Sequence, residues 1–444
     1  MSHIQGFSNT MLYKSRSLGF VSTIKDAMFK LVRRRHLPKR ISIGLVLVII
    51  LVALTIYVNL SFFWSEEVFI EWTPPDPFMS RRVIRKAQAC LLDSPFIPEE
   101  KPPMLLDPDY ELPPDAEQHY RDLLRVTRPL RGIRPSTYAG YSGPWLEDMF
   151  IKQFCCNKPL SFFGGLIPLF VQWTDLWHLR PGEEWQISPH GSKFFAMLRK
   201  DVMYLAISQH AEGLYHLRKF MKPQDHWNIL TLSGGGHGHA PIPLFLNEQP
   251  FHPVYDDDNT PNLFVFAGNI VVYPVRLAMM RVLGKLSSSE PSFAFKHYTG
   301  EDWAQVMRTG KLNLAPRGYG RTSFRLIESL QMGLVPVYVY DDHDWSPYKG
   351  SEANIRNFGF AVNISEFESF VQDMAKKNAE NPNFLNLKER VAKLKKVRES
   401  HYTLSGLMQQ IQYFFQDDQR TSITCQRHPM TYVCCDHQLW VQNT

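Results

Sequence analysis

The sequence feature that most constrains the fold is the stretch LNLAPRGYGRTSFRLIESLQMGLVPVYVY, which occupies residues 312–340. It begins with an apolar run of strand length and passes through a glycine-rich turn. An amphipathic segment follows over residues 322–332, stops at Gly333 and leads into a second apolar run. Apolar runs joined by an amphipathic segment predict parallel strands connected by a helix. The stretch therefore predicts one βαβ unit that can bind a nucleotide.

The same alternation extends from residue 116 to the C-terminus. Strand candidates are residues 165–172, 202–208, 228–233, 263–267, 293–297, 312–315, 335–340 and 359–362. Helix candidates are residues 115–126, 275–286, 302–309, 322–332, 365–377 and 385–398. This order predicts an α/β protein with two facing Rossmann-like domains, residues 116–250 and 251–384, with a seam near 245–260. Residues 385–444 form a C-terminal helix, expected to cross back to the first domain, and a tail that contains cysteines.

The N-terminal region predicts a membrane anchor. Residues 41–65 read ISIGLVLVIILVALTIYVNLSFFWS and carry no charged residue. A helix of this length, at about 1.5 Å per residue, crosses a hydrocarbon core of roughly 30 Å. Nine Lys and Arg residues lie in the preceding residues 1–40, and acidic residues follow the apolar run. The positive-inside rule therefore predicts a cytosolic basic tail, a signal anchor and a lumenal body, which is a single-pass type II arrangement.

Residues 66–115 are rich in proline and acidic residues, as in TPPDP and EEKPPMLLDPDYELPPD. Such a composition disfavours helix interiors, so we expect an extended stem with little regular structure. The net charge of +6 is located in the basic tail, and the remainder of the chain is close to neutral. No nucleic-acid partner is therefore predicted.

All six cysteines lie after the apolar run, on the predicted lumenal side: Cys90, Cys155, Cys156, Cys425, Cys434 and Cys435. That compartment favours disulfides, whose pairing the sequence leaves open. The alternative is a zinc site formed by cysteines and histidines after residue 424, which lacks a regular ligand spacing. Asn363-Ile-Ser365 is an acceptor sequence for N-glycosylation.

The 312–340 stretch predicts a site for the diphosphate of a nucleotide. The residues expected to bind the donor are Arg317, Gly318, Gly320, Arg321, Thr322, Ser323, Arg325 and Glu328. The glycines allow a tight turn, the helix N-terminus offers N–H groups, and the arginines, expected to be exposed in the loop, add positive charge. Glu328 is expected to reach ribose hydroxyls. The alternative for Arg325 and Glu328 is an ordinary surface ion pair.

A second glycine-rich loop, SGGGHGH, covers residues 233–239. Gly234, Gly235 and Gly236 permit close approach of the backbone to a phosphate or sugar, and His237 and His239 are expected at the cleft. His237 could remove a proton from an acceptor hydroxyl, because the unperturbed pKa of histidine is about 6.5. Loop packing is the alternative role for both histidines.

The segment LAPRGYGRTSFRLIESLQMGLVPV resembles the signature of the exostosin family of glycosyltransferases. Weaker resemblance extends over residues 115–420 through YSGPWLEDMF, FGGLIPLFVQWTD, LRKDVMYLAISQH and NILTLSGGGHGHAPIPLF. It implies a GT-B fold, a type II protein of the Golgi or endoplasmic reticulum, and inverting transfer from a nucleotide sugar. It also implies donor-site roles for the residues at 317, 318, 320, 321, 323 and 328, and a cleft position for the 234–239 loop. The sequence DDHDWSPY departs from the family after Val337, which leaves acceptor specificity open.

The predicted activity is hexosyl or glucuronosyl transfer, with inversion, from a donor expected to be a UDP-sugar to a glycan or glycoprotein acceptor. Candidate bases are Glu147, His237, Asp175 and Asp148; Glu147 is ranked first because the family has a matching glutamate three residues before an aromatic. Asp148 could instead be a helix-start acid. The Asp-x-Asp spacings at residues 256–258 and 342–344 suggest Mn²⁺, but the three arginines favour a site without metal, so no cofactor is predicted.

The sequence also allows two other interpretations. The chain could be a non-catalytic member of the same family that binds glycan or stabilises a partner, or a metal-dependent transferase with one Rossmann domain. The sequence does not decide whether the chain acts alone or in a homo- or hetero-oligomer.

Overall fold

The computed structural model describes residues 77–94, 97–131, 144–177, 184–214, 227–254, 260–289 and 293–426. The chain divides into two compact units, residues 1–70 and 71–444, and all described residues belong to the second. The predicted basic tail and the anchor at 41–65 therefore lie outside the described residues. Within the ranges given above, no helix has both the length and the apolar character needed to cross a bilayer.

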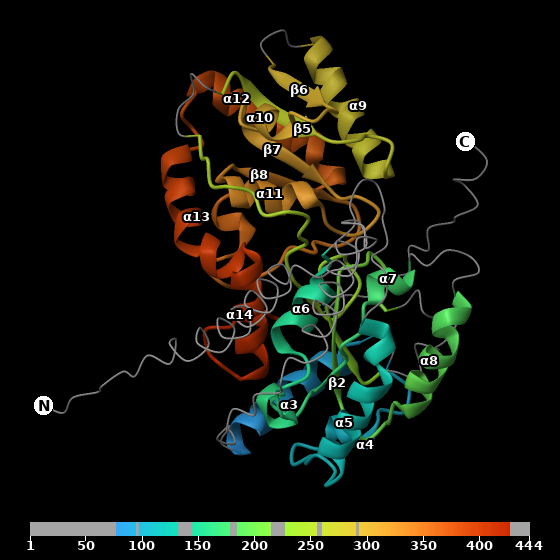
Figure 1. Ribbon diagram of the computed structural model, residues 1–444. Helices are drawn as coiled ribbons and strands as arrows, with labels where there is room; N and C mark the ends of the chain where they lie inside the picture. Colours follow the sequence, from blue (N-terminus) through green and yellow to red (C-terminus); the bar gives the residue numbers. More distant parts are fainter. Residues whose placement is uncertain are drawn as a thin grey trace, which may run out of the picture. The chain divides into compact units, whose positions relative to one another are not determined.

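The first half of the second unit is built on a parallel sheet in the order β1-β2-β3-β4. Its strands are β1 Ile167–Pro168, β2 Tyr204–Ser208, β3 Ile229–Ser233 and β4 Ala240–Pro241. Every strand residue is buried, as expected for a parallel sheet covered on both faces. The helices of this half are α3 Pro77–Leu92, α4 Pro103–Leu106, α5 Ala116–Val126, α6 Leu146–Phe154, α7 Trp173–Trp177 and α8 Glu184–Met197 (Figure 1).

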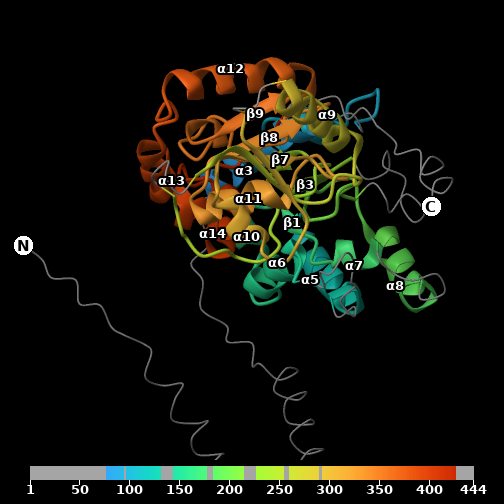
Figure 2. The ribbon, with the colours of Figure 1, turned by 90° about the horizontal axis from the view of Figure 1, so that it is seen from above.

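The second half is built on a parallel sheet in the order β6-β5-β7-β8-β9. Its strands are β5 Asn262–Ala267, β6 Phe295–Tyr298, β7 Gly310–Pro316, β8 Pro336–Tyr340 and β9 Phe360–Asn363. Its helices are α9 Pro274–Ser289, α10 Trp303–Met307, α11 Phe324–Met332 and α12 Phe367–Glu380. Figure 2 shows α9 and α12 on one face of this sheet and α10 and α11 on the other. The predicted α/β class with parallel sheets is confirmed.

The strand order of the second sheet reverses between β5 and β7. From β5 the chain first adds β6 on one side and then returns to add β7 on the other. The loops that leave the carboxyl ends of β5 and β7 therefore diverge to opposite faces. Such a reversal opens a crevice, which is where doubly wound sheets bind their ligands.

The chain returns to the first half through its last helix. Helix α13 (Leu387–His401) packs against α11, and α14 (Leu404–Phe415) packs against α6. The ring of Phe415 lies 5.3 Å from that of Phe154 and 5.2 Å from that of Phe163, measured between centroids. The sequence predicted that the helix at residues 385–398 returns to the first half. In the structure it is α14, which the sequence did not predict, that packs on the first half.

The expectation of little regular structure over residues 66–115 is wrong for the part that the structure describes. Helix α3 buries Val83, Ile84, Ala87 and Leu91 in the core of the first half. These positions form one apolar stripe at helical spacing. Prolines are compatible with this because Pro77 begins α3 and Pro103 begins α4, where a missing N–H costs no hydrogen bond.

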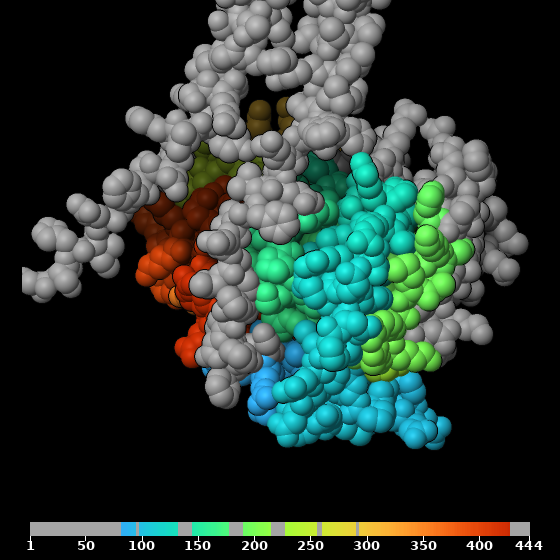
Figure 3. All heavy atoms as spheres, turned by 60° about the horizontal axis from the view of Figure 1, so that its bottom comes forward, coloured from blue at the N-terminus to red at the C-terminus, as the bar shows by residue number. Residues whose placement is uncertain are grey.

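The segment of residues 97–131 also packs on the first half. Figure 3 shows α4 and α5 as part of one surface with α8, and α5 contacts α8 directly. Among the described residues two disulfides form, Cys90–Cys425 and Cys155–Cys156. The first joins α3 to the last described segment, with 5.6 Å between the Cα atoms. Cys434 and Cys435 lie outside the described residues.

Candidate active site

The predicted donor loop follows β7 and leads into α11. The backbone N–H of Arg317 donates to the Val339 carbonyl, and that of Gly318 to the Thr322 carbonyl, so the loop is held as a tight turn. Helix α11 begins at Phe324, with Ser323 as its N-cap residue. It ends at Gly333 in the left-handed conformation (φ 79°), as the sequence predicted. Thr322 and Ser323 are both buried at the start of this helix.

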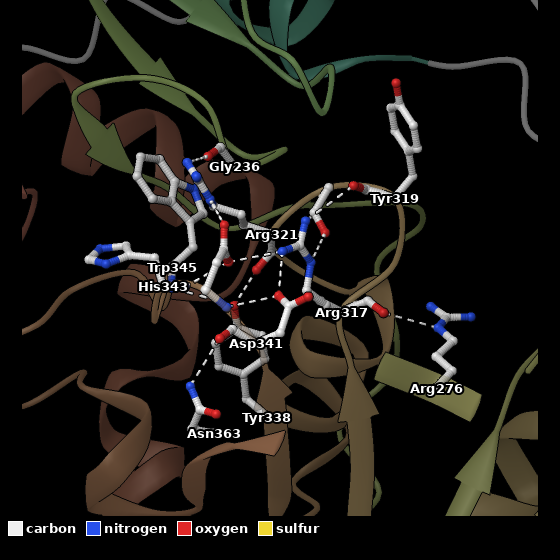
Figure 4. Close-up of polar contacts among 12 residues, drawn as sticks. Gly236, Arg276, Arg317, Tyr319, Arg321, Tyr338, Asp341, His343, Trp345 and Asn363 are labelled. Carbon is white, nitrogen blue, oxygen red and sulfur yellow. Dashed lines mark hydrogen bonds and ion pairs between the residues drawn. The ribbon is translucent and has the colours of Figure 1, made fainter. Parts of the chain in front are cut away.

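The arginines of this loop are buried, contrary to the expectation that they are exposed. Arg317 is 4% and Arg321 is 1% exposed. Arg317 Nη1 lies 2.6 Å from Asp341 Oδ1 and 2.9 Å from Asp342 Oδ1, and Arg321 Nε donates to Asp342 Oδ2 at 2.7 Å (Figure 4). Burial acts to raise the pKa of Asp342, but the two guanidinium groups outweigh it and hold that pKa below its ordinary value.

The Asp-x-Asp spacing at residues 342–344 therefore supplies counter-ions for basic side chains. Asp344 accepts from Arg356 Nη2 at 3.0 Å and lies 3.6 Å from Lys349 Nζ. Residues 256–258, the other acidic candidate, lie outside the described residues. Among the residues that the structure does describe, no group of three or more His, Cys, Asp or Glu side chains is arranged to hold a metal ion.

The predicted cleft loop, residues 234–239, lies directly against the donor loop. The Arg321 backbone N–H donates to the Gly235 carbonyl at 3.0 Å, and Arg321 Nη1 donates to the Gly236 carbonyl at 3.2 Å. Trp345 Nε1 adds a bond to the Ser233 carbonyl at 3.1 Å, and Tyr319 donates to Glu212. These bonds join the loops of the two halves.

Only glycine fits where the donor loop meets the cleft loop, because there is no space for a side chain. A Cβ atom at Gly236, whose φ is +124°, would lie 2.5 Å from the Arg321 nitrogen. A Cβ at Gly320 would lie 2.1 Å from the Gly235 carbonyl oxygen. The glycines predicted to approach a ligand thus let the two loops approach each other.

The two histidines of the cleft loop differ in their surroundings. His239 is buried, and its Nδ1 accepts a hydrogen bond from the Thr231 backbone N–H at 3.0 Å. The ring therefore carries its proton on Nε2, and burial lowers the pKa of His239 to about 4. His239 is a neutral packing residue, which is the alternative role considered above. His237 is half-buried. Its backbone carbonyl packs closely against Gly213, because a Cβ atom placed on Gly213 would lie 2.3 Å from that oxygen.

Glu147 lies in the first turn of α6 and is 1% exposed. Its Oε1 accepts three hydrogen bonds: from Thr174 N at 3.2 Å, Thr174 Oγ1 at 2.7 Å and Gln209 N at 3.1 Å. Its Oε2 is buried without a hydrogen-bond partner among the described residues. Burial raises the pKa of Glu147 to about 8, because these bonds offset only part of the cost of removing the charge from water.

Two more carboxylates gather at the start of α6. Asp175 is buried on α7 and accepts from Trp145 Nε1 at 2.7 Å. Asp148 accepts from the Trp145 backbone N–H at 2.7 Å, so it completes a capping arrangement, as the helix-start alternative predicted. The acidic cluster of Glu147, Asp148 and Asp175 lies beside the cleft loop. Leu146, which precedes Glu147 in α6, contacts this loop so closely that a Cβ atom at Gly234 would lie 2.7 Å from Leu146 Cδ1.

Arg325 and Glu328 lie at the carboxyl end of β5, beside the reversal in strand order. Arg325 Nε donates to the Ala267 carbonyl at 2.7 Å, its guanidinium lies 3.9 Å from the Trp303 ring centroid, and it pairs with Glu328. Glu328 is 2% exposed, and its Oε1 has no hydrogen-bond partner among the described residues. Burial, the larger effect, raises the pKa of Glu328. The pair is thus buried, unlike an ordinary surface ion pair.

The sequence analysis missed one basic residue at this place, Arg276 in the first turn of α9. Its Nε donates to the Arg317 carbonyl at 3.1 Å, and its Nη1 to the Asn269 carbonyl at 2.7 Å. Asn269 follows β5 and Arg317 follows β7, so this side chain joins the ends of the two strands. Figure 4 shows its contact with the Arg317 carbonyl. Sequence alone could not find it, because the adjacency of β5 and β7 appears only in the sheet order.

The chain was compared with protein families, curated proteins and solved structures. No family model and no curated protein matches the chain. The solved structure of TarM is similar with a TM-score of 0.31 and 11% identity, over 52% of this chain and 53% of TarM. That of the GtfA/B complex is similar with a TM-score of 0.29 and 11% identity, over 54% of this chain and 49% of the other. The chain thus matches about half the length of each.

Proposed function

We propose that this chain is a glycosyltransferase of the exostosin type, with a GT-B fold, that transfers a sugar from a nucleotide-sugar donor, such as a UDP-sugar, to a glycan acceptor with inversion. The observation that carries the proposal is the reversal in strand order between β5 and β7. A glycine-rich turn, the N-terminus of α11, and the buried pair of Arg325 and Glu328 all gather at the carboxyl ends of these strands. Ligands of doubly wound sheets bind at such a place.

The chemistry of sugar transfer fits these groups. The departing nucleoside diphosphate gains negative charge as the glycosidic bond breaks, and backbone N–H groups, a helix N-terminus and arginines stabilise that charge. The unpartnered Oε1 of Glu328 is a hydrogen-bond acceptor that a ribose hydroxyl can satisfy. In this proposal the second half holds the donor.

The first half would then bind the acceptor and supply the base. Glu147, His237 and Asp175 are the candidates, and Glu147 and Asp175 share the acidic cluster that adjoins the cleft loop. Because burial raises the pKa of Glu147 to about 8, a carboxylate here becomes a stronger base than an exposed one once it is ionised. We also propose a Golgi or endoplasmic reticulum location, with the sequence at residues 41–65 as the membrane anchor.

A nucleotide panel tests the proposal. The full chain is heated with UDP, GDP and their sugars, and release of nucleotide from each radiolabelled sugar is measured in parallel. At a ligand concentration of 100 Kd, binding adds about 2.7 kcal/mol of stability, so the melting temperature rises measurably. Glu328→Gln should reduce the rise, while Glu368→Gln, an exposed acid on α12, serves as the matched control. If no nucleotide shifts the melting temperature and no sugar is released, the proposal is wrong.

A further inference from the structure

We propose that a groove along β9, the edge strand of the second sheet, binds a neutral sugar unit of a glycan. The groove has a volume of about 710 Å³, within the range of roughly 300–1,000 Å³ that is usual for ligand sites. Its walls come from β9, the segment before it, α12 and Arg390 of α13, and α12 contacts β9 directly (Figure 2). Strand β8 separates β9 from β7, so the groove lies apart from the proposed donor site. The inference goes beyond the proposed function, because it needs neither a nucleotide nor turnover.

One guanidinium is held in this groove with unused hydrogen-bond donors. Arg390 Nε donates to the Leu385 carbonyl at 2.8 Å, and the guanidinium lies 4.9 Å from the centroid of the Phe360 ring. Within the described part of the chain, its two terminal nitrogens have no hydrogen-bond or ion-pair partner. Burial lowers the pKa of Arg390 more than the nearby Glu389 raises it, and Glu389 itself pairs with Lys393 at 2.7 Å. The charge of Arg390 is therefore not neutralised by a carboxylate.

The groove also contains one unused acceptor. Glu366 lines it just before α12 and is exposed, and its carboxylate has no hydrogen-bond or ion-pair partner among the described residues. The other two charged residues of the groove already have partners. Arg356 Nη2 lies 3.0 Å from Asp344 Oδ2, and Asp373 Oδ2 lies 2.7 Å from Lys377 Nζ. A ligand thus meets one guanidinium and one carboxylate.

Two aromatic rings add an apolar surface. Phe360 and Phe370 both line the groove, are partly exposed and lie 5.3 Å apart between ring centroids. Such rings can contact the C–H groups of a sugar while polar side chains bind its hydroxyls. Because the Phe360 ring and the Leu385 carbonyl already fix Arg390, little side-chain freedom is lost on binding.

This set of groups favours a polyhydroxy compound over an anion or a peptide. Hydroxyl groups both donate and accept, so they can bind the guanidinium and the carboxylate together. A phosphate would be attracted by Arg390 but repelled by Glu366. A peptide strand would have to pair with the edge of β9. That edge is covered, because Ala361 and Val362 are 9% and 6% exposed and Arg356 Nη1 donates to the Ala361 carbonyl at 3.1 Å.

The test measures binding of defined compounds to the full chain by calorimetry and ligand-observed NMR. The probes are neutral tetrasaccharides of glucose, N-acetylglucosamine, mannose and xylose, with a heparin tetrasaccharide, pyrophosphate and a lysine-capped Thr-Val peptide for comparison. Arg390→Gln should weaken binding of the preferred neutral tetrasaccharide about tenfold or more. Arg390→Lys should also weaken it, because it keeps the charge but loses the fork of donors. Lys396→Gln, at an exposed cation of the same helix, is the matched control and should change nothing.

A second variant guards against misfolding. Glu366→Ala removes the acceptor, leaves Arg390 in place and should cause a similar loss. The response of the melting temperature to UDP and GDP should stay as in the wild type for both variants.

Unchanged tetrasaccharide affinity in Arg390→Gln would overturn the inference, because the sugar would then bind elsewhere. Binding of the anions or the peptide alone, or of no neutral tetrasaccharide, would overturn it as well. These outcomes leave the proposed function standing. A chain that binds sugar through Arg390 but responds to no nucleotide would instead overturn the proposed function and keep this inference.

Discussion

Replacing Glu147 by glutamine should remove a dependence of stability on pH that the wild-type chain shows. Because burial raises the pKa of Glu147 from 4.5 in the unfolded chain to about 8, the folded protein keeps a proton that the unfolded chain has lost. Stability is therefore highest below the unfolded pKa and falls as pH rises towards 8. Below pH 6.5 the buried His239, whose folded pKa is about 4, produces the opposite slope.

Other buried groups, such as Glu328, also titrate, so the contribution of Glu147 is obtained from the difference between the wild type and Glu147→Gln. One proton difference corresponds to about 1.4 kcal/mol per pH unit, so ionisation of Glu147 should cost the wild-type chain about 2 kcal/mol between pH 6.5 and 8. Glutamine cannot ionise, and its amide oxygen can accept the same bonds from Thr174 and Gln209. Between pH 6.5 and 8 the Glu147→Gln protein should therefore lose about 2 kcal/mol less stability than the wild type.

Urea unfolding followed by tryptophan fluorescence, at several pH values in this interval, measures the free energy of unfolding. Asp122→Asn, at a carboxylate on the outer side of α5, is the control and should keep the wild-type slope. Parallel slopes for the wild type and Glu147→Gln would refute the reasoning, since the carboxyl group would then titrate alike in the folded and unfolded chains.

Three further changes test the contacts around the site. Arg321→Ala should cost about 3 kcal/mol in urea unfolding, because it removes a buried side chain and leaves Asp342 with one arginine partner instead of two; an unchanged midpoint would contradict this. Gly236→Ala should cost about 2–4 kcal/mol through a close contact and a positive φ, seen as a lower melting temperature. Cys90→Ser should cost about 4 kcal/mol, since its bridge closes 335 residues, whereas Cys156→Ser should cost little without reductant.

Much of the sheet framework could be predicted from the sequence. Each of the eight strand candidates overlaps a strand, although β1 covers only two of the residues 165–172. Most of these strands are buried, and buried parallel strands require continuous apolar runs that few other elements contain. The two-residue strand β4 (Ala240–Pro241) is too short to leave such a pattern. Helix α14 was not predicted, although its buried residues Leu407, Ile411, Phe414 and Phe415 recur at helical spacing and could have indicated it.

The site was harder to predict than the sheets. The positions of the glycines are informative because only glycine permits the contact between the two loops. The pairing of Arg317 with Asp341 joins residues at the ends of β7 and β8, which are neighbouring parallel strands. The predicted βαβ unit already implied that these ends lie together, and this could have indicated a buried ion pair. The position of Arg276 depends on the order of the sheet, which local patterns do not encode.

The bridge between Cys90 and Cys425 closes the body of the chain into a covalent ring. A protease that cuts any loop between these positions leaves both fragments attached to each other. A nicked chain would therefore migrate as one species on a gel without reductant and separate only after reduction. The fragments would also stay close enough to re-form their buried contacts, so damage at a surface loop need not release either half.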